Sequence, residues 1–304
     1  MASATRSRAA TLTAGIAGAS GYAGHELVRL LAGHPTFRGA DIGADADRLA
    51  ECDVALLALP HGASGPLALE LEQAGTPVVD LSRDLRGDWP YGLPELHRDE
   101  LAAATAVANP GCYATAAVLS LAPLVAAGAV EPHLVVDGKS GVSGAGKSPT
   151  QSNVFCQAAE GIAAYTPVGH PHQDEIEREL TAIAERPVSV TFTPHLAPFV
   201  RGLLVTAYAR LALPLTQAGV DDLYASAYAH EPFVQIVSQP RTQALRGSNL
   251  CHVAAWVDES RGAVVACAAI DNLVKGAAGQ AIQNANLMLG LPEQTGLPAT
   301  EVWP

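Results

Sequence analysis

Residues 11–33, which read TLTAGIAGASGYAGHELVRLLAG, decide the fold of the chain. Residues 11–17 have the apolar composition of a short buried strand, and Gly18, Gly21 and Gly24 follow at three-residue spacing. The next residues place leucines at a helical spacing and end at a glycine. A strand, a glycine-rich turn and a helix in this order let a pyrophosphate approach backbone N–H groups at the helix N-terminus. The stretch therefore predicts a nucleotide-binding site.

Strand and helix patterns also alternate after this stretch. Apolar runs at 53–60 and 76–82 are short and bounded by turn residues, which predicts a parallel α/β sheet of the Rossmann type. After about residue 130, longer β-rich runs predict an α+β domain with a mixed or antiparallel sheet and helices on one face. Residues 272–290 have the spacing of a long amphipathic helix that returns to the first domain. We therefore expect a dinucleotide-binding domain over 1–113 plus 272–304, and a catalytic, substrate and oligomerisation domain over 114–271.

Composition excludes several classes of protein. The 304 residues are 49% hydrophobic and 16% charged, which excludes a largely disordered chain. No apolar run approaches the ~20 residues that span a bilayer, so we expect no membrane partner. The net charge of −12 argues against a nucleic-acid partner. Five cysteines without a CxxC pair favour a reducing compartment, and we expect a cytoplasmic protein whose first ten residues are a loose leader.

The segment NPGCYAT at 109–115 places Cys112 at the start of a helix-like run. The positive end of a helix dipole lowers the pKa of a thiol, and the same N–H groups stabilise an oxyanion. Cys112 is therefore a candidate nucleophile. The other cysteines lie in apolar runs and are expected to be small buried hydrophobic residues: Cys52, Cys156, Cys251 and Cys267.

A nucleophilic cysteine needs a base, and the segment GHPHQDEIE at 169–177 offers two histidines. His170 and His172 stand before Glu175, where a helix is expected to begin. The HxH spacing also occurs in metal sites, but no Cys or acidic partner stands at ligand spacing, so no metal is predicted. A nucleotide fold with a helix-initiating cysteine and a distant histidine suggests thioester chemistry with hydride transfer.

These residues resemble the N-acetyl-γ-glutamyl-phosphate reductase family, within the broader aspartate-semialdehyde dehydrogenase group. The resemblance extends over nearly the whole chain, through GASGYAGHELVRLL, ALPHG, YGLPEL, NPGCYATAA, KSGVSGAGK, GHPHQDEIE, FTPHLAPFVRG and IDNLVKGAAGQAIQNANLMLG. It implies NADPH-dependent reduction of an acyl phosphate to a semialdehyde in arginine biosynthesis, with phosphate release. It also implies a homo-oligomer, either a dimer or a tetramer.

The resemblance implies roles for individual residues as well. Cys112 would be the nucleophile and His170 or His172 the acid/base; we favour His172 because Glu175, three residues on, would orient it. The residues expected to bind the cofactor are Gly18, Ser20, Gly21, Tyr22, Ala23, Gly24, Pro60, Ser140, Gly141 and Asn272. The residues expected on the substrate side are Asn109, Glu175, Arg201, Ser248 and Asn249.

The sequence also departs from the family pattern. The connection at 36–52 is short where the family carries a longer strand–helix region, and the stretch before YGLPEL is shortened too. A short strand near ADIGA and a short helix over DADRLAEC would fill the first gap. This connection carries Asp41, Asp45 and Asp47 beside Arg38 and Arg48, so the residues themselves leave NAD open against NADP. The family's HRH is HPH in this chain.

Three other functions fit parts of this pattern. A related reductase acts on a carrier-protein-linked aminoadipyl or glutamyl phosphate, and the negative net charge disfavours an acidic carrier. Aspartate-semialdehyde dehydrogenase itself fits the NPGCYATAA and IDNLVKGAAGQ segments less well. A nucleotide-binding regulatory homologue with low activity would follow if the shortened connections abolish turnover, although Cys112 and the HPH segment are both retained.

Overall fold

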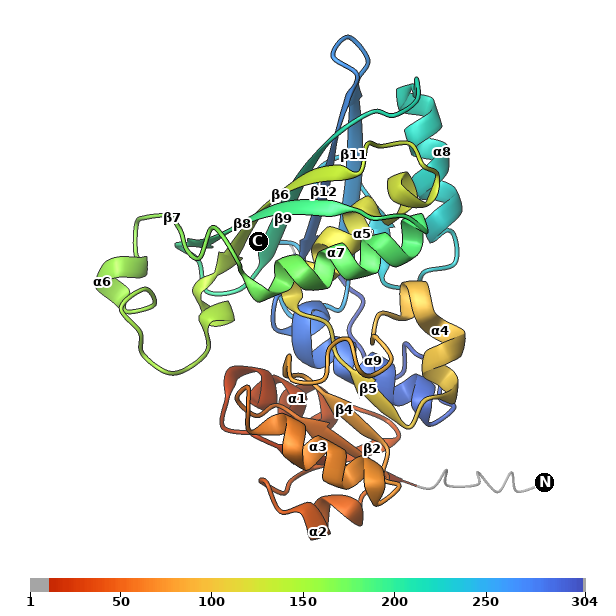
Figure 1. Cartoon of the computed structure of the whole chain (residues 1–304). Coiled ribbons are helices and arrows are strands. Elements are labelled where there is room, and N and C mark those ends of the chain that lie inside the picture. The colour runs from red at the N-terminus through yellow and green to blue at the C-terminus, as the bar shows by residue number, and fades with distance from the viewer. Residues whose placement is uncertain (1–10, 303–304) are drawn as a thin grey trace, which may run out of the picture.

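The computed structural model describes residues 11–302, so the leader predicted at 1–10 lies outside the described residues. Figure 1 shows two sheets with their helices, one above the other. No helix within the described range combines the length and the apolar character that crossing a bilayer requires.

The N-terminal sheet is wholly parallel, in the order β2-β1-β3-β4-β5. Its strands are β1 (Leu12–Ala17), β2 (Phe37–Asp41), β3 (Val54–Leu57), β4 (Val78–Asp80) and β5 (Ala106–Ala108). The helices of this half are α1 (Tyr22–Ala32), α2 (Ala46–Ala50), α3 (Ser64–Gln73) and α4 (Pro94–Ala103). Every residue of β3 and β4 is buried because helices cover both faces of the sheet. The predicted Rossmann-type sheet is confirmed.

Each face of this sheet has its own apolar core. Leu27 and Leu30 of α1 pack with Ile16 of β1 on one face. Leu49 of α2 packs with α3 on the other face. The short strand and short helix expected between 36 and 52 are present as β2 and α2. The carboxyl ends of the parallel strands therefore meet at the edge that faces the second sheet.

The second sheet is mixed and has the order β10-β11-β12-β9-β6-β8-β7, which confirms the predicted α+β architecture. Its strands are β6 (His133–Gly141), β7 (Ala163–Ala164), β8 (Ser189–Ala197), β9 (Leu203–Arg210), β10 (Val234–Ile236), β11 (Cys251–Asp258) and β12 (Ala263–Ile270). Three helices pack on one face, namely α5 (Cys112–Ala126), α7 (Pro171–Ala184) and α8 (Gln217–Tyr228).

The helix predicted over 272–290 is present, but it is not a uniform α-helix. It begins with a π-helical turn, Val274–Ala278, and continues as α9 (Gly279–Met288). Ile282 of α9 packs in the same core as α1, so this helix returns to the first sheet as expected. The wide turn brings Gly276 so close to Cys112 that a Cβ there would lie 2.7 Å from the cysteine Cβ. The π-helical turn thus lies where the chain packs against α5. A regular 3.6-residue period does not predict such a turn.

Residues 142–170 form an arm between β6 and α7. The arm begins with a 3₁₀ turn (Val142–Ala145) and contains α6 (Phe155–Ala158) and β7. In Figure 1 the part of the arm around α6 extends away from both sheets, whereas its strand β7 pairs with β8 at the edge of the second sheet. Cys156 on α6 is exposed, so the prediction that it is buried was wrong. The apolar residues around it have no sheet to pack on, because the arm leaves the core.

Candidate active site

Cys112 is the first residue of α5, and the preceding Gly111 is an extended N-cap without a side-chain cap. Burial raises the pKa of the Cys112 thiol to about 11, although Arg86 and the backbone N–H groups of the first turn act to lower it. This corrects the expectation of a lowered pKa, because removal of water outweighs the helix N-terminus. Cys112 is a protonated thiol at neutral pH and needs a base.

His172 supplies a neutral imidazole next to this position. Its Nε2 lies only 2.2 Å from where a Cβ on Gly111 would be, so only glycine leaves room for the ring before the cysteine. Burial lowers the pKa of His172 to about 3, with Glu175 acting in the opposite direction. The ring is therefore uncharged at neutral pH. Its Nδ1 has no hydrogen-bond partner within residues 11–302.

His170 has a different position. It is the N-cap of α7, and its Nδ1 accepts the N–H of His172 at 3.2 Å. Its ring packs edge-to-face on Tyr113, Tyr165 and Phe192. This geometry favours His172 over His170 as the acid/base, and the assignment stays a prediction.

Arg86 was not predicted from the sequence, and its buried guanidinium fixes the floor of the site. Its Nη1 donates to Glu175 at 3.0 Å, while Nε and Nη2 donate to the carbonyl oxygens of Asn109 and Leu81. Arg86 follows the carboxyl end of β4, where α/β proteins bind ligands, and that position was the available signal.

Glu175 is the other half of this pair, and it does not orient His172 as the sequence suggested. It accepts the N–H of Gly111 at 2.7 Å and the hydroxyl of Tyr91 at 2.8 Å. Burial acts to raise the pKa of Glu175, but Arg86, His172 and these hydrogen bonds together keep it below the usual value. The ionised carboxylate therefore holds the turn that presents Cys112, and a substrate role for Glu175 stays a prediction.

The glycine turn joins β1 to α1 as predicted. Gly18 has φ +88°, and a Cβ there would lie 2.4 Å from the carbonyl oxygen of Ala58. A Cβ on Gly24 would lie 2.0 Å from the carbonyl oxygen of Gly18, so the helix packs on the turn only with glycine there. Helix α1 has no side-chain cap and no acid in its first turn. Its free N–H groups, which include those of Tyr22 and Ala23, suit an anion such as a dinucleotide pyrophosphate.

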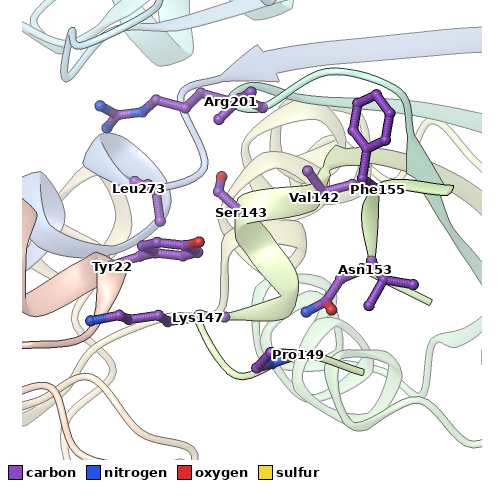
Figure 2. A pocket seen from close by; sticks show the side chains of 12 residues that line it. Tyr22, Val142, Ser143, Lys147, Pro149, Asn153, Phe155, Arg201 and Leu273 are labelled. Carbon is purple, nitrogen blue, oxygen red and sulfur yellow. The ribbon is translucent and has the colours of Figure 1, made fainter. Parts of the chain in front are cut away.

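A cavity of about 390 Å³ lies between α1 and the segment that follows β6. Figure 2 shows Tyr22 of α1 opposite Ser143 and Lys147. The Nζ of Lys147 donates to the carbonyl oxygen of Ser20 at 3.2 Å and so joins the two halves. The cavity therefore lies between the start of α1 and the turn that follows β6 of the second sheet.

The other predicted cofactor residues lie around this junction. Asn272 donates from Nδ2 to Ser143 and accepts the N–H of Gly202, which fixes the turn after β6. Ser140 is buried at the end of β6, and a Cβ on Gly141 would lie 2.7 Å from the carbonyl oxygen of Val200. Pro60 follows β3 and is exposed. Their contacts with a cofactor stay predictions.

Three predicted substrate residues have other partners in this structure. Arg201 lines the cavity but pairs with Glu26 at 3.0 Å and Asp271 at 3.2 Å. Ser248 donates to the carbonyl oxygen of Pro298, and Asn249 donates to Gln283 of α9. These bonds tie the second sheet to α1, α9 and the C-terminal segment. A substrate role for these residues stays a prediction.

Asn109 lies directly before the Pro-Gly turn, and its side chain is also engaged. It donates to the carbonyl oxygen of Ala277 at 3.2 Å and accepts from Asn284 at 3.1 Å. Asn109 therefore connects the cysteine turn to the π-helical turn and α9. Within residues 11–302, no group of three or more His, Cys, Asp or Glu side chains is arranged to hold a metal ion.

Comparisons with known proteins agree with this geometry. The family described as "Semialdehyde dehydrogenase, NAD binding domain" matches residues 39–104, and "Semialdehyde dehydrogenase, dimerisation domain" matches residues 112–272. The chain therefore contains a domain that binds a nucleotide cofactor. Aspartate semialdehyde dehydrogenase II from Vibrio cholerae, complexed with ASA, has a TM-score of 0.75 at 19% identity, covering 92% of this chain and 98% of that one. The enzyme with NADP from Candida albicans has a TM-score of 0.72 at 17% identity, covering 92% and 99%. Both likenesses show the shared fold.

Sequence relatives define the family more narrowly. An N-acetyl-gamma-glutamyl-phosphate reductase from Micrococcus luteus is 43% identical over 97% of this chain and 100% of its own length. The corresponding protein from Dehalococcoides mccartyi is 41% identical over 96% and 98%. Identity at this level over nearly the whole of both chains, together with the cysteine–histidine site on a semialdehyde dehydrogenase fold, shows that this protein belongs to the N-acetyl-gamma-glutamyl-phosphate reductase family.

Proposed function

We propose that this protein reduces N-acetyl-L-glutamyl 5-phosphate to N-acetyl-L-glutamate 5-semialdehyde in arginine biosynthesis, with release of phosphate. The observation that carries the proposal is the placement of Cys112 at an uncapped helix N-terminus, with neutral His172 against the preceding Gly111. The names of relatives at 41–43% identity supply the substrate.

Acylation of Cys112 is the first chemical step. The sulfur attacks the acyl carbon, a C–S bond forms, and the bond from carbon to the phosphate oxygen breaks, so that phosphate leaves with the electron pair. The thiol is protonated at rest, and its proton passes to neutral His172 as the attack occurs. The charge of Arg86 favours the developing thiolate. The first turn of α5 has no side-chain cap, which supports a role for its N–H groups in stabilising the oxyanion.

The thioester is then reduced. A nicotinamide dinucleotide, when bound in its reduced form, supplies the hydride. The protein holds the acylated Cys112 against Gly276. His172 keeps the proton that it took from the thiol and returns it to the sulfur when the C–S bond breaks. Collapse of the resulting thiohemiacetal breaks the C–S bond, releases the aldehyde and restores the thiol.

The dinucleotide site is proposed to begin at the glycine turn and to follow the cavity toward Ser140, Gly141 and Asn272. The uncapped N-terminus of α1 and the close approach at Gly18 and Gly24 support this position. The family resemblance implies NADPH. NADH carries the same nicotinamide, so the assay of the proposed activity includes both cofactors.

We also propose the division into domains at 113/114 and 271/272, and a homo-oligomer in the cytoplasm. The face of the second sheet without helices supports the oligomer, because Val135, Tyr208, Val265 and Trp256 lie side by side across four strands. Three of these four large side chains are exposed, and the matched family is described as a dimerisation domain. All five cysteines are free, which suits a reducing compartment.

The reverse reaction tests the proposed activity. Purified protein, N-acetyl-glutamate 5-semialdehyde, phosphate and oxidised NADP or NAD should give a rise in the absorbance of the reduced cofactor. The rise should require phosphate, because phosphate releases the acyl group from Cys112. Aspartate semialdehyde is the matched control and should react much more slowly. Absence of phosphate-dependent reduction with both cofactors would refute the proposal.

Substitution by Asn should separate the two histidines. His172→Asn should lower kcat by roughly 10²–10⁴-fold, as expected for the loss of general acid–base catalysis. His170→Asn is the matched control, because Asn is a good N-cap and preserves the start of α7. It should mainly raise KM. Both values come from steady-state kinetics in the reverse direction, and equal small effects would show that the base lies elsewhere.

A further inference from the structure

Asp41 is the last residue of β2 and lies beside the glycine turn. It pairs in register with Ile16 of β1, and the N–H groups of the two residues after it donate to the carbonyl oxygen of Ile16. Strand β1 ends one residue later at Ala17, and Gly18 begins the turn. Asp41 is exposed, and no described residue pairs with its carboxylate or donates to it. A free carboxylate therefore stands at the carboxyl edge of the sheet.

An acid at this place has a defined use in a Rossmann-type domain. A carboxylate about 20 residues past the glycines accepts a hydrogen bond from the 2′-hydroxyl of the adenosine ribose. Asp41 has this spacing from Gly21. A 2′-phosphate on the same ribose would be repelled by the carboxylate, because both groups are negatively charged. A basic side chain beside the phosphate would be needed to make the net interaction attractive.

Neither arginine of this connection pairs with Asp41. Arg38 lies three residues before Asp41 on β2 and pairs in register with Thr13 of β1. Because side chains alternate along a strand, the Cβ of Arg38 leaves β2 on the opposite face from that of Asp41 and roughly 10 Å back from the edge. Both residues nevertheless line a cavity beside α1. Arg48 is an exposed residue of α2. Along the sequence it has acidic residues on both sides, with Asp47 before it and Glu51 and Asp53 after it. Among the described residues, the carboxylate of Asp41 therefore has no cation paired with it.

We propose that this protein binds NAD(H) in preference to NADP(H), and that Asp41 determines the preference by accepting a hydrogen bond from the ribose. The inference rests on the dinucleotide site of the proposed function and departs from the NADPH that the family resemblance implies. The short connection between β2 and β3 matters because it leaves α2 as the only helix there, so Asp41 at the end of β2 is the acid beside the glycine turn.

Equilibrium binding tests the preference without turnover. Titration calorimetry at fixed ionic strength with NADH and NADPH should show that the wild type binds NADH more tightly, by about tenfold or more. Asp41→Asn keeps the shape and removes the charge, so NADPH should gain affinity, NADH should lose some, and the ratio should fall toward one. Asp47→Asn is the matched control, because it removes an equal charge from the first turn of α2. It should leave the ratio near that of the wild type.

Three results would overturn the proposal. The first is a wild type that binds NADPH as tightly as NADH, and the second is an unchanged ratio in Asp41→Asn. The third is selective loss of NADPH affinity in Arg48→Ala, which would show that this arginine reads a 2′-phosphate. A preference for NADH in a protein without phosphate-dependent turnover would refute the proposed reaction alone. Absence of binding to either dinucleotide would refute both.

Discussion

Cys112→Ser should lose turnover by a factor on the order of 10³ or more while it still binds the dinucleotide. A serine hydroxyl differs from the thiol by one atom, so packing against Gly276 is retained. Its oxygen is a much weaker nucleophile than the thiol sulfur, and an alcohol gives up its proton to the same His172 far less readily than a thiol does. Turnover in the reverse direction and cofactor binding by calorimetry should be measured on the same preparation. Activity close to that of the wild type would exclude the covalent mechanism.

Alkylation provides the chemical control for this variant. Iodoacetamide should inactivate the wild type in parallel with labelling of Cys112, and acyl phosphate should protect it. Because burial holds the pKa of this thiol near 11, the rate should be slow at neutral pH and rise as the pH increases. Cys156 is exposed and should be labelled without loss of activity. Inactivation that follows labelling of Cys156 instead would contradict the assignment of Cys112.

Lys275→Met should lower the free energy of unfolding by roughly 3–5 kcal/mol, because it leaves a buried carboxylate without its cation. Lys275 and Glu95 have no exposed side-chain surface, and their Nζ–Oε1 distance is 2.6 Å. The Nζ also donates to Gln283 at 2.8 Å, so the pair joins α4, the π-helical turn and α9. Chemical denaturation followed by circular dichroism measures the change.

Two further variants separate the ion pair from other causes. Replacing both partners, as in Lys275→Met with Glu95→Leu, should recover much of the loss, because no charge is then buried alone. Arg261→Met breaks the exposed pair with Asp258 and should change stability little. A double variant as unstable as Lys275→Met would show that packing of the lysine chain, rather than its charge, stabilises the turn.

Local patterns predicted the elements that position the site. The glycine turn between β1 and α1, the helix that begins at Cys112, and the helix that begins within HPH all follow from spacing that a few neighbouring residues fix. The short β2 and α2 also followed, because turn residues and apolar positions bound them locally. Such features depend on backbone propensity and capping, which act over about one turn.

Contacts between segments far apart in the sequence could not be predicted from local patterns. Arg86 and Glu175 are 89 positions apart, and Lys275 and Glu95 are 180 apart. A charged residue in a sequence predicts an exposed side chain unless its partner is known, because a lone buried charge is costly. The ion pair under the cysteine turn and the pair behind α9 are therefore visible only in the folded chain.

The sequence alone predicted the two-sheet architecture and the glycine turn, and it indicated Cys112 as the candidate nucleophile, because each depends on a local pattern of glycines, apolar residues or helix starts. The tertiary structure decided how these groups behave. It buries the Cys112 thiol and thereby raises its pKa, against the direction expected from the helix N-terminus. It also places His172, rather than His170, against Gly111, and leaves Asp41 without a cation at the sheet edge. Solvation and charge at a site depend on everything packed around it, and a linear pattern does not contain that information.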